Sequence, residues 1–161
     1  MREILFRGKR IDNGEWLEGY LTYRYHYCEQ SEKEILWPVI DWPHELTLGK
    51  VPGIVISPIK VIPDTVGQFT GLTDKNGEKI FEGDIIRCWY HRDGKEDLVT
   101  VEQVVFHQGA FVAHATNGTA KWWVHLPNND GCKPLDKVYL REVEVIGNIH
   151  DNPELIGGGR R

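Results

Sequence analysis

The stretch that decides the fold is GQFTGLTDKNGEKIFEGDIIRCWY, residues 67–90. It holds two turn signals, DKNG at residues 74–77 and EGD at residues 82–84, between three short apolar pieces. Asn and Gly tolerate the positive φ that tight hairpin turns need, so the pattern predicts short antiparallel strands. We expect Gly77 to have a positive φ. We expect Glu82 and Asp84 to accept backbone N–H groups rather than to act as a catalytic pair.

The strand after the second turn has a period-two pattern. Ile86, Cys88 and Tyr90 lie on one face, which we expect to point into the core. Arg87 then points outward. Ile85 and Trp89 share this outer face and need cover from another part of the chain. Because a slip of one residue exchanges the two faces of a strand, burial of Ile86 and Cys88 tests this register.

The composition indicates one soluble, mainly β protein. The chain has 161 residues, with six Trp, six Tyr and five Phe. Aromatic and β-branched residues favour strands over helices. Residues 1–62 hold eight basic and nine acidic side chains, and residues 63–161 hold eleven and fifteen. Neither part is basic, which argues against a typical nucleic-acid binder.

Cysteine usage and hydropathy predict a cytoplasmic protein. Cys28, Cys88 and Cys132 are far apart and odd in number, which argues against a disulfide framework. No apolar run approaches the length of a membrane span. The first residues do not resemble a secretory signal peptide. We therefore expect no contact with a membrane.

The first sixty residues are predicted to form a hairpin and an arm. The turn DNG at residues 12–14 precedes a strand over residues 15–25 that is apolar on both faces. Pro38 and Pro43 are expected to interrupt strand pairing, and we expect the arm to be too short to build a core of its own. Large aromatic side chains are common anchors of protein interfaces. The candidate interface residues are Trp16, Tyr20, Trp37 and Trp42.

Three segments of the chain closely resemble the YopX family of phage and prophage proteins. They are REILFRGKR (residues 2–10), QFTGLTDKNGEKIFEGDII (residues 68–86) and EVIGNIHDNPELI (residues 144–156). The resemblance implies a small SH3-like β-barrel and no enzymatic activity, and the family offers no functional residues to transfer. We place the arm at residues 1–62 and the barrel at 63–161. The barrel ends in a short helix that starts near Pro153 and a flexible tail.

Metal binding and catalysis are weighed as alternatives. Soft ligands occur in the pairs His26 and Cys28, Cys88 and His91, and His107 and His114, the last pair expected to face each other across a hairpin. Their spacing matches no standard zinc site, so we predict no metal and no cofactor. A catalytic thiol needs a nearby base, and Cys88 is expected to be a buried apolar residue instead. An unrecognised metal-dependent or thiol enzyme is the least favoured alternative.

Single-stranded nucleic-acid binding is the main alternative. Aromatic and basic residues alternate at two places, as they do in single-strand binders. These candidate residues are Trp89, Arg92, Lys121, Trp122 and Trp123. The acidic net charge of −5 weighs against this function. The favoured interpretation is a non-enzymatic phage or prophage accessory protein in the host cytoplasm. It would bind a protein partner and assemble as a homo-oligomer through its arm.

Overall fold

The computed structural model describes residues 4–28, 32–48, 51–92, 94–107, 109–115, 123–125 and 138–157. The chain divides into two compact units, Met1–Phe69 and Thr70–Arg161. The boundary expected near Pro63 falls at a short 3-10 turn, η1 (Pro63–Thr65), ahead of this division. Both units are built from antiparallel strands, which confirms the prediction of a mainly β protein.

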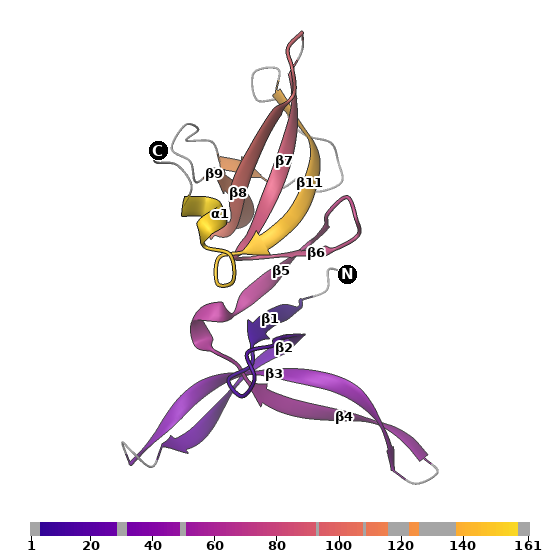
Figure 1. Ribbon diagram of the computed structural model, residues 1–161. Helices are drawn as coiled ribbons and strands as arrows, with labels where there is room; N and C mark the ends of the chain where they lie inside the picture. Colours follow the sequence, from indigo (N-terminus) through magenta and orange to yellow (C-terminus); the bar gives the residue numbers. More distant parts are fainter. Residues whose placement is uncertain are drawn as a thin grey trace. The chain divides into compact units, whose positions relative to one another are not determined.

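The first unit is organised around one long strand. Its strands are β1 (Phe6–Lys9), β2 (Trp16–Cys28), β3 (Lys33–Leu48) and β4 (Val51–Lys60), and β5 (Gly67–Thr73) begins in it. They follow the order β4-β3-β2-β1-β5. β3 pairs with β2 and β4 at once only over residues 39–41. Beyond these residues the β2–β3 and β3–β4 ribbons run away from each other (Figure 1).

The prediction that prolines interrupt pairing is wrong. Pro38 and Pro43 both lie within the continuous strand β3. Pro38 pairs only with Tyr23 of β2, and Pro43 pairs only with Ile56 of β4. Each proline therefore lies just outside residues 39–41, where β3 has one neighbouring strand instead of two. A proline is tolerated at such edge positions because one side of the strand needs no N–H donor.

The expectation that the arm lacks a core is also wrong. Leu17, Ile40 and Val61 are buried together in the first unit, and Ile59 and Val66 pack against them. Gly19 makes this packing possible, because a Cβ there would lie 2.6 Å from the backbone oxygen of Asp41. The cluster is located where β3 has two partner strands, so the unit is stabilised at its centre.

The second unit contains a five-stranded sheet with the order β10-β9-β8-β7-β11. Its elements are β6 (Lys79–Phe81), β7 (Asp84–Arg92), β8 (Leu98–His107), β9 (Ala110–Ala115), β10 (Trp123–His125), β11 (Val138–Asn148) and α1 (Glu154–Gly157). The short C-terminal helix is confirmed. Within the described residues the strand order does not close on itself, so the SH3-like barrel remains a prediction.

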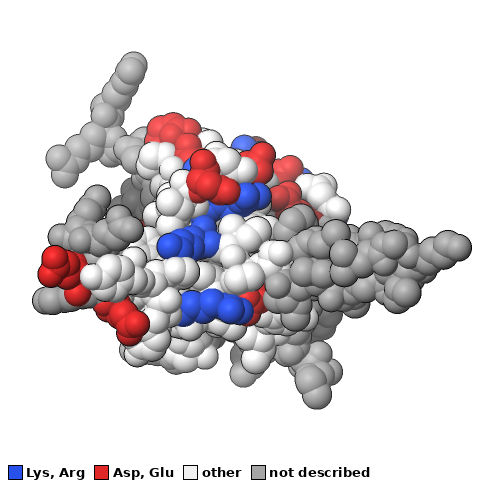
Figure 2. Space-filling model, turned by 90° about the horizontal axis from the view of Figure 1, so that it is seen from below, with Lys and Arg blue, Asp and Glu red and all other residues white. Residues whose placement is uncertain are grey.

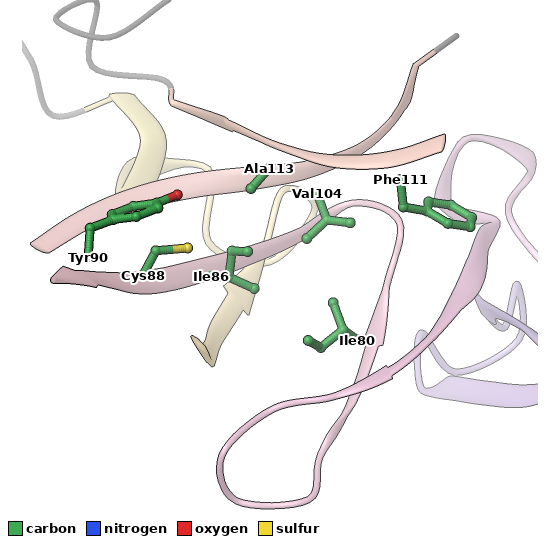
Figure 3. Packing of buried hydrophobic residues seen from close by; sticks show 7 residues of the cluster. All are labelled: Ile80, Ile86, Cys88, Tyr90, Val104, Phe111 and Ala113. Atoms are coloured by element: carbon green, nitrogen blue, oxygen red, sulfur yellow. The ribbon is translucent and has the colours of Figure 1, made fainter. Parts of the chain in front are cut away.

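The register predicted for β7 is confirmed. Ile86, Cys88 and Tyr90 are buried and follow one another on one face of the strand (Figure 3). They form one apolar cluster with Ile80, Val104, Phe111 and Ala113. Arg87 is partly exposed, as expected, while Ile85 on the same outer face is fully buried. The core of the second unit therefore lies on the predicted face of β7.

The two turns of the opening stretch are held as their chemistry predicts. Gly77 has a φ of 85°. Asp84 is fully buried, and its Oδ2 accepts a hydrogen bond of 2.7 Å from the backbone nitrogen of Phe81. The N–H acceptor role predicted for Asp84 is confirmed, and the role of Glu82 remains a prediction. Both turns thus fix the chain reversals that set the register of β7.

Candidate functional site

An exposed row of tyrosines runs along one face of the β2–β3 ribbon. Tyr23, Tyr25 and Tyr27 of β2 are 59%, 70% and 65% exposed. Leu36 of β3 pairs directly with Tyr25 and is 49% exposed. Directly opposed residues of an antiparallel pair project to the same face of the sheet. We call the three tyrosines the tyrosine surface, and Leu36 borders it.

The local sequence explains why these side chains share a face. Tyrosine recurs at every second position in the run YRYHY, residues 23–27, which matches the period of a strand. The residues between them project to the opposite face. There Thr22 and Arg24 donate hydrogen bonds of 3.1 Å to the carboxylate of Asp41. This second face of the ribbon thus carries a charged cluster beside apolar residues, whereas the tyrosines share the first face.

The interface residues predicted from the sequence have different surroundings. Trp16 is half-buried, with the Arg7 guanidinium 4.8 Å from its ring centre. Trp37 is half-buried, and its indole Nε1 donates a hydrogen bond of 2.9 Å to the backbone oxygen of Val61. Both therefore have partners within the first unit. Tyr20 is 53% exposed. The side chain of Trp42 lies outside the described residues.

The sequence interpretation missed Tyr23, Tyr25 and Tyr27 as candidate contact residues. The alternating run of tyrosines was the signal that could have found them. It was overlooked because tryptophan is the stronger interface anchor and because both faces of the strand carry apolar groups. The structure separates the two groups, since the tryptophans that it describes are partly buried and these tyrosines are exposed.

The predicted aromatic and basic surface of the second unit is only partly described. Lys75 Nζ lies 4.1 Å from the ring centre of Trp89, and the Arg87 guanidinium lies at 5.9 Å. Both cations also pair with Glu144 Oε2, at 3.5 and 3.2 Å. The side chains of Arg92 and Trp123, and all of Lys121 and Trp122, lie outside the described residues. Around Trp89, both nearby cations thus pair with one carboxylate, which neutralises one of the two positive charges.

The described charged side chains form no continuous basic field on the face shown in Figure 2. Lysine and arginine side chains lie there in separate groups, with uncharged residues between them and acidic residues beside several of them. A nucleic-acid backbone is usually bound by a groove of uncompensated positive charge. That face offers isolated cations instead.

A buried polar group lies beside the core of the second unit. The Glu102 carboxylate accepts hydrogen bonds from Thr100 Oγ1 at 2.6 Å and from the Tyr90 hydroxyl at 3.1 Å. Burial raises the pKa of Glu102 and also that of Tyr90. Burial likewise raises the pKa of the Cys88 thiol. The thiol is therefore protonated at neutral pH, unlike the thiolate of a nucleophilic cysteine.

The expectation that His107 and His114 face each other is wrong, and the side chain of Cys28 lies outside the described residues. His107 pairs with Ala110 and His114 pairs with Gln103, so the two histidines do not face each other. His107 lies at the end of the β8–β9 ladder. Cys88 is buried, whereas the exposed His91 has its Nδ1 3.0 Å from Asp97 Oδ1. In the part of the chain that the structure describes, no three His, Cys, Asp or Glu side chains cluster as metal ligands would.

The comparisons with known proteins agree with the sequence resemblance. The profile of the family described as YopX protein matches residues 6–157, nearly the whole chain. This chain belongs to the YopX family. The crystal structure of protein EF1440 from Enterococcus faecalis is similar to this YopX chain, with 24% sequence identity and a TM-score of 0.50. The similarity covers 97% of this chain and 99% of that one and indicates a shared fold.

Two features are absent from this YopX chain as far as it is described: a curated relative and a helix that could span a membrane. No curated protein matches it. Among the described residues, no helix has both the length and the apolar character that a membrane span requires.

Proposed function

We propose that this YopX chain is a non-enzymatic accessory protein that binds a protein partner through the tyrosine surface. One observation carries the proposal: three tyrosines, each more than half exposed, lie side by side on one face of a two-stranded ribbon. Tyrosine supplies a large contact area at a small cost in conformational entropy, and it is enriched in protein interfaces.

The size of the surface supports a protein partner. A tyrosine side chain buries about 150–250 Å² when it is covered. At the observed exposures, the three tyrosines leave about 400 Å² of mainly aromatic surface in contact with water. Apolar patches of more than a few hundred Å² are unusual on a monomer and generally mark a contact site. The tyrosine surface reaches that range.

Self-association is part of this proposal. We also propose that the chain is a phage or prophage product that acts in the cytoplasm of a host bacterium. The protonated thiol of Cys88 and the dispersed histidines support a non-enzymatic role. An SH3-like relationship of the second unit also remains a proposal. Nucleic-acid binding is less well supported, because both cations beside Trp89 pair with Glu144.

A capture experiment tests the proposal. The purified chain is immobilised and exposed to an extract of bacteria that express it, and captured proteins are identified by mass spectrometry. A variant with Tyr23→Ser, Tyr25→Ser and Tyr27→Ser should lose the captured protein. Tyr20→Ser is the matched control, because Tyr20 is also exposed but lies on the opposite face of β2. Equal capture by the wild-type chain and the triple variant would contradict the proposal.

A further inference from the structure

Among the described residues, no strand lies along the outer edge of β2 beside the tyrosine surface. β1 pairs with β2 only over Trp16–Gly19. β3 pairs with the rest, Tyr20–Cys28, from the other side. In the described part of the chain, the second edge of these nine residues has no partner strand. A strand edge of this kind is a template for pairing with another chain.

The composition of this edge favours pairing. Proteins usually protect exposed edges with proline, lysine or inward-pointing charges. β4, the strand at the end of this sheet, follows the rule, because it contains Pro52, Pro58 and Lys60. Tyr20–Cys28 has no proline and no lysine, and its one full charge is Arg24. That guanidinium lies 3.1 Å from Asp41 Oδ1, so the charge is compensated.

We propose that the partner at this surface is a second copy of the chain, an inference that rests on the proposed function. The two β2 edges pair antiparallel about a two-fold axis at Tyr25. This register places Tyr25 opposite Tyr25 of the second copy, Tyr23 opposite its Tyr27, and Arg24 opposite its His26. Cross-strand aromatic pairs of this kind stabilise a sheet. An axis at Arg24 would instead place two arginines opposite each other, which is unfavourable.

The pairing completes an otherwise marginal element. An isolated two-stranded ribbon is barely stable in water, whereas a sheet of three or more strands is stable. Two ribbons joined in this way give a four-stranded sheet in the order β3-β2-β2-β3. The two copies would touch only through the backbone edges and the flanks of the tyrosines, whereas a specific interface usually buries about 1,000 Å² or more over both partners. A weak dimer with closed two-fold symmetry is therefore expected.

Complementary charges at the axis test this arrangement. Sedimentation velocity over a concentration series gives the dimer dissociation constant for each chain. Tyr25→Lys and Tyr25→Glu, each alone, place like charges opposite each other and should weaken the dimer about tenfold or more. An equimolar mixture of the two variants should form a mixed dimer about as tight as that of the wild-type chain. Circular dichroism confirms that each variant is folded.

Leu36→Lys is the matched control. Leu36 lies opposite Tyr25 on the same face, but one strand farther from the proposed axis. Edge pairing predicts that Leu36→Lys changes the dissociation constant of the dimer less than about threefold. Face-to-face stacking of two tyrosine surfaces predicts instead that Leu36→Lys and Tyr25→Lys raise this constant equally. A monomeric wild-type chain, a mixture that fails to recover, or equal damage from Leu36→Lys would overturn the inference. If the chain is monomeric but the triple tyrosine variant still loses its captured protein, the proposed function stands and only the second copy is excluded.

Discussion

β7 of the second unit and β2 of the first unit carry similar alternating patterns but have opposite environments. In β7, Ile86 and Cys88 are fully buried against neighbouring strands. In β2, Tyr23 and Tyr25 alternate with polar residues in the same way, yet they are mostly exposed. The period of two fixes which residues share a face, but a second layer decides whether that face is core or surface. The following predictions test this difference, starting with the largest effect.

Removing one side chain from each face should give very different losses of stability. Ile86→Ala should lower the free energy of unfolding by about 2–5 kcal/mol, because it leaves a cavity in the core. Tyr25→Ala should cost less than about 1 kcal/mol in dilute solution, since only a cross-strand contact is lost. Urea denaturation measures both values. Similar losses for the two variants would show that the tyrosine face is covered.

The second unit also depends on a buried carboxylate that has no counterpart on the tyrosine surface. Burial alone would raise the pKa of Asp74, but hydrogen bonds from the backbone nitrogens of Val145, Glu78 and Asn76 outweigh it and lower that pKa. Its stabilisation is therefore present above its ordinary pKa near 3.8 and is lost as the pH falls through the lower folded value.

Asp74→Ala should thus cost about 2 kcal/mol at neutral pH, because it leaves buried N–H groups unpaired. Urea denaturation between neutral and acidic pH measures the free energy of unfolding. The difference in this free energy between the variant and the wild-type chain should become smaller below about pH 4. A gap that stays constant with pH would contradict this role of the carboxylate.

Substitutions of Gly77 test the effect of backbone strain on stability apart from that of core packing. Gly77→Val should cost about 1–2 kcal/mol, because a β-branched residue is poorly tolerated at a φ of 85°. Apart from its two chain neighbours, no atom lies within 4 Å of the position of an added Cβ, so a clash of the Cβ with a distant residue does not explain the cost. Gly77→Asn is the control and should cost less, since Asn tolerates this conformation. Thermal unfolding distinguishes them, and equal losses would exclude the backbone explanation.

Glu102 should produce the smallest effect, with the opposite dependence on pH. Its folded pKa is raised mainly by burial, so the folded state keeps a proton that the unfolded state has already lost. Stability therefore falls as the pH rises from about 4.5 through the raised folded pKa. Glu102→Gln should remove this fall and make the chain more stable than the wild type at neutral pH. Urea denaturation across this pH range measures the free energy of unfolding of both chains. The same pH dependence for Glu102→Gln and the wild type would contradict the prediction.

Local sequence signals predicted the parts of the fold that depend on local chemistry. The turn at Gly77, the acceptor role of Asp84 and the burial of Ile86 and Cys88 all follow from turn residues and the strand period. The position of Pro38 in a continuous strand could not be predicted in this way. Whether a proline interrupts pairing depends on how many strands flank it, which is a property of the whole sheet.

The candidate site was predicted less well for the same reason. The sequence showed that β2 carries apolar groups on both faces, but not which aromatic side chains have partners. Trp37 is anchored by a hydrogen bond to Val61, a residue 24 positions away along the chain. Tyr25 has no comparable anchor among the described residues and stays exposed. Exposure therefore depends on long-range contacts, and only the alternating tyrosines give a local hint of the site.

Amide hydrogen exchange at two protein concentrations tests the central claim most directly. The tyrosine surface and the adjoining edge of β2 are proposed to bind a second copy. Backbone amides within Tyr20–Cys28 should therefore exchange more slowly at about 100 µM than at about 1 µM, because association protects an edge that is open in the monomer. Amides of β7 should exchange equally at both concentrations. Identical exchange of Tyr20–Cys28 at the two concentrations would contradict the account.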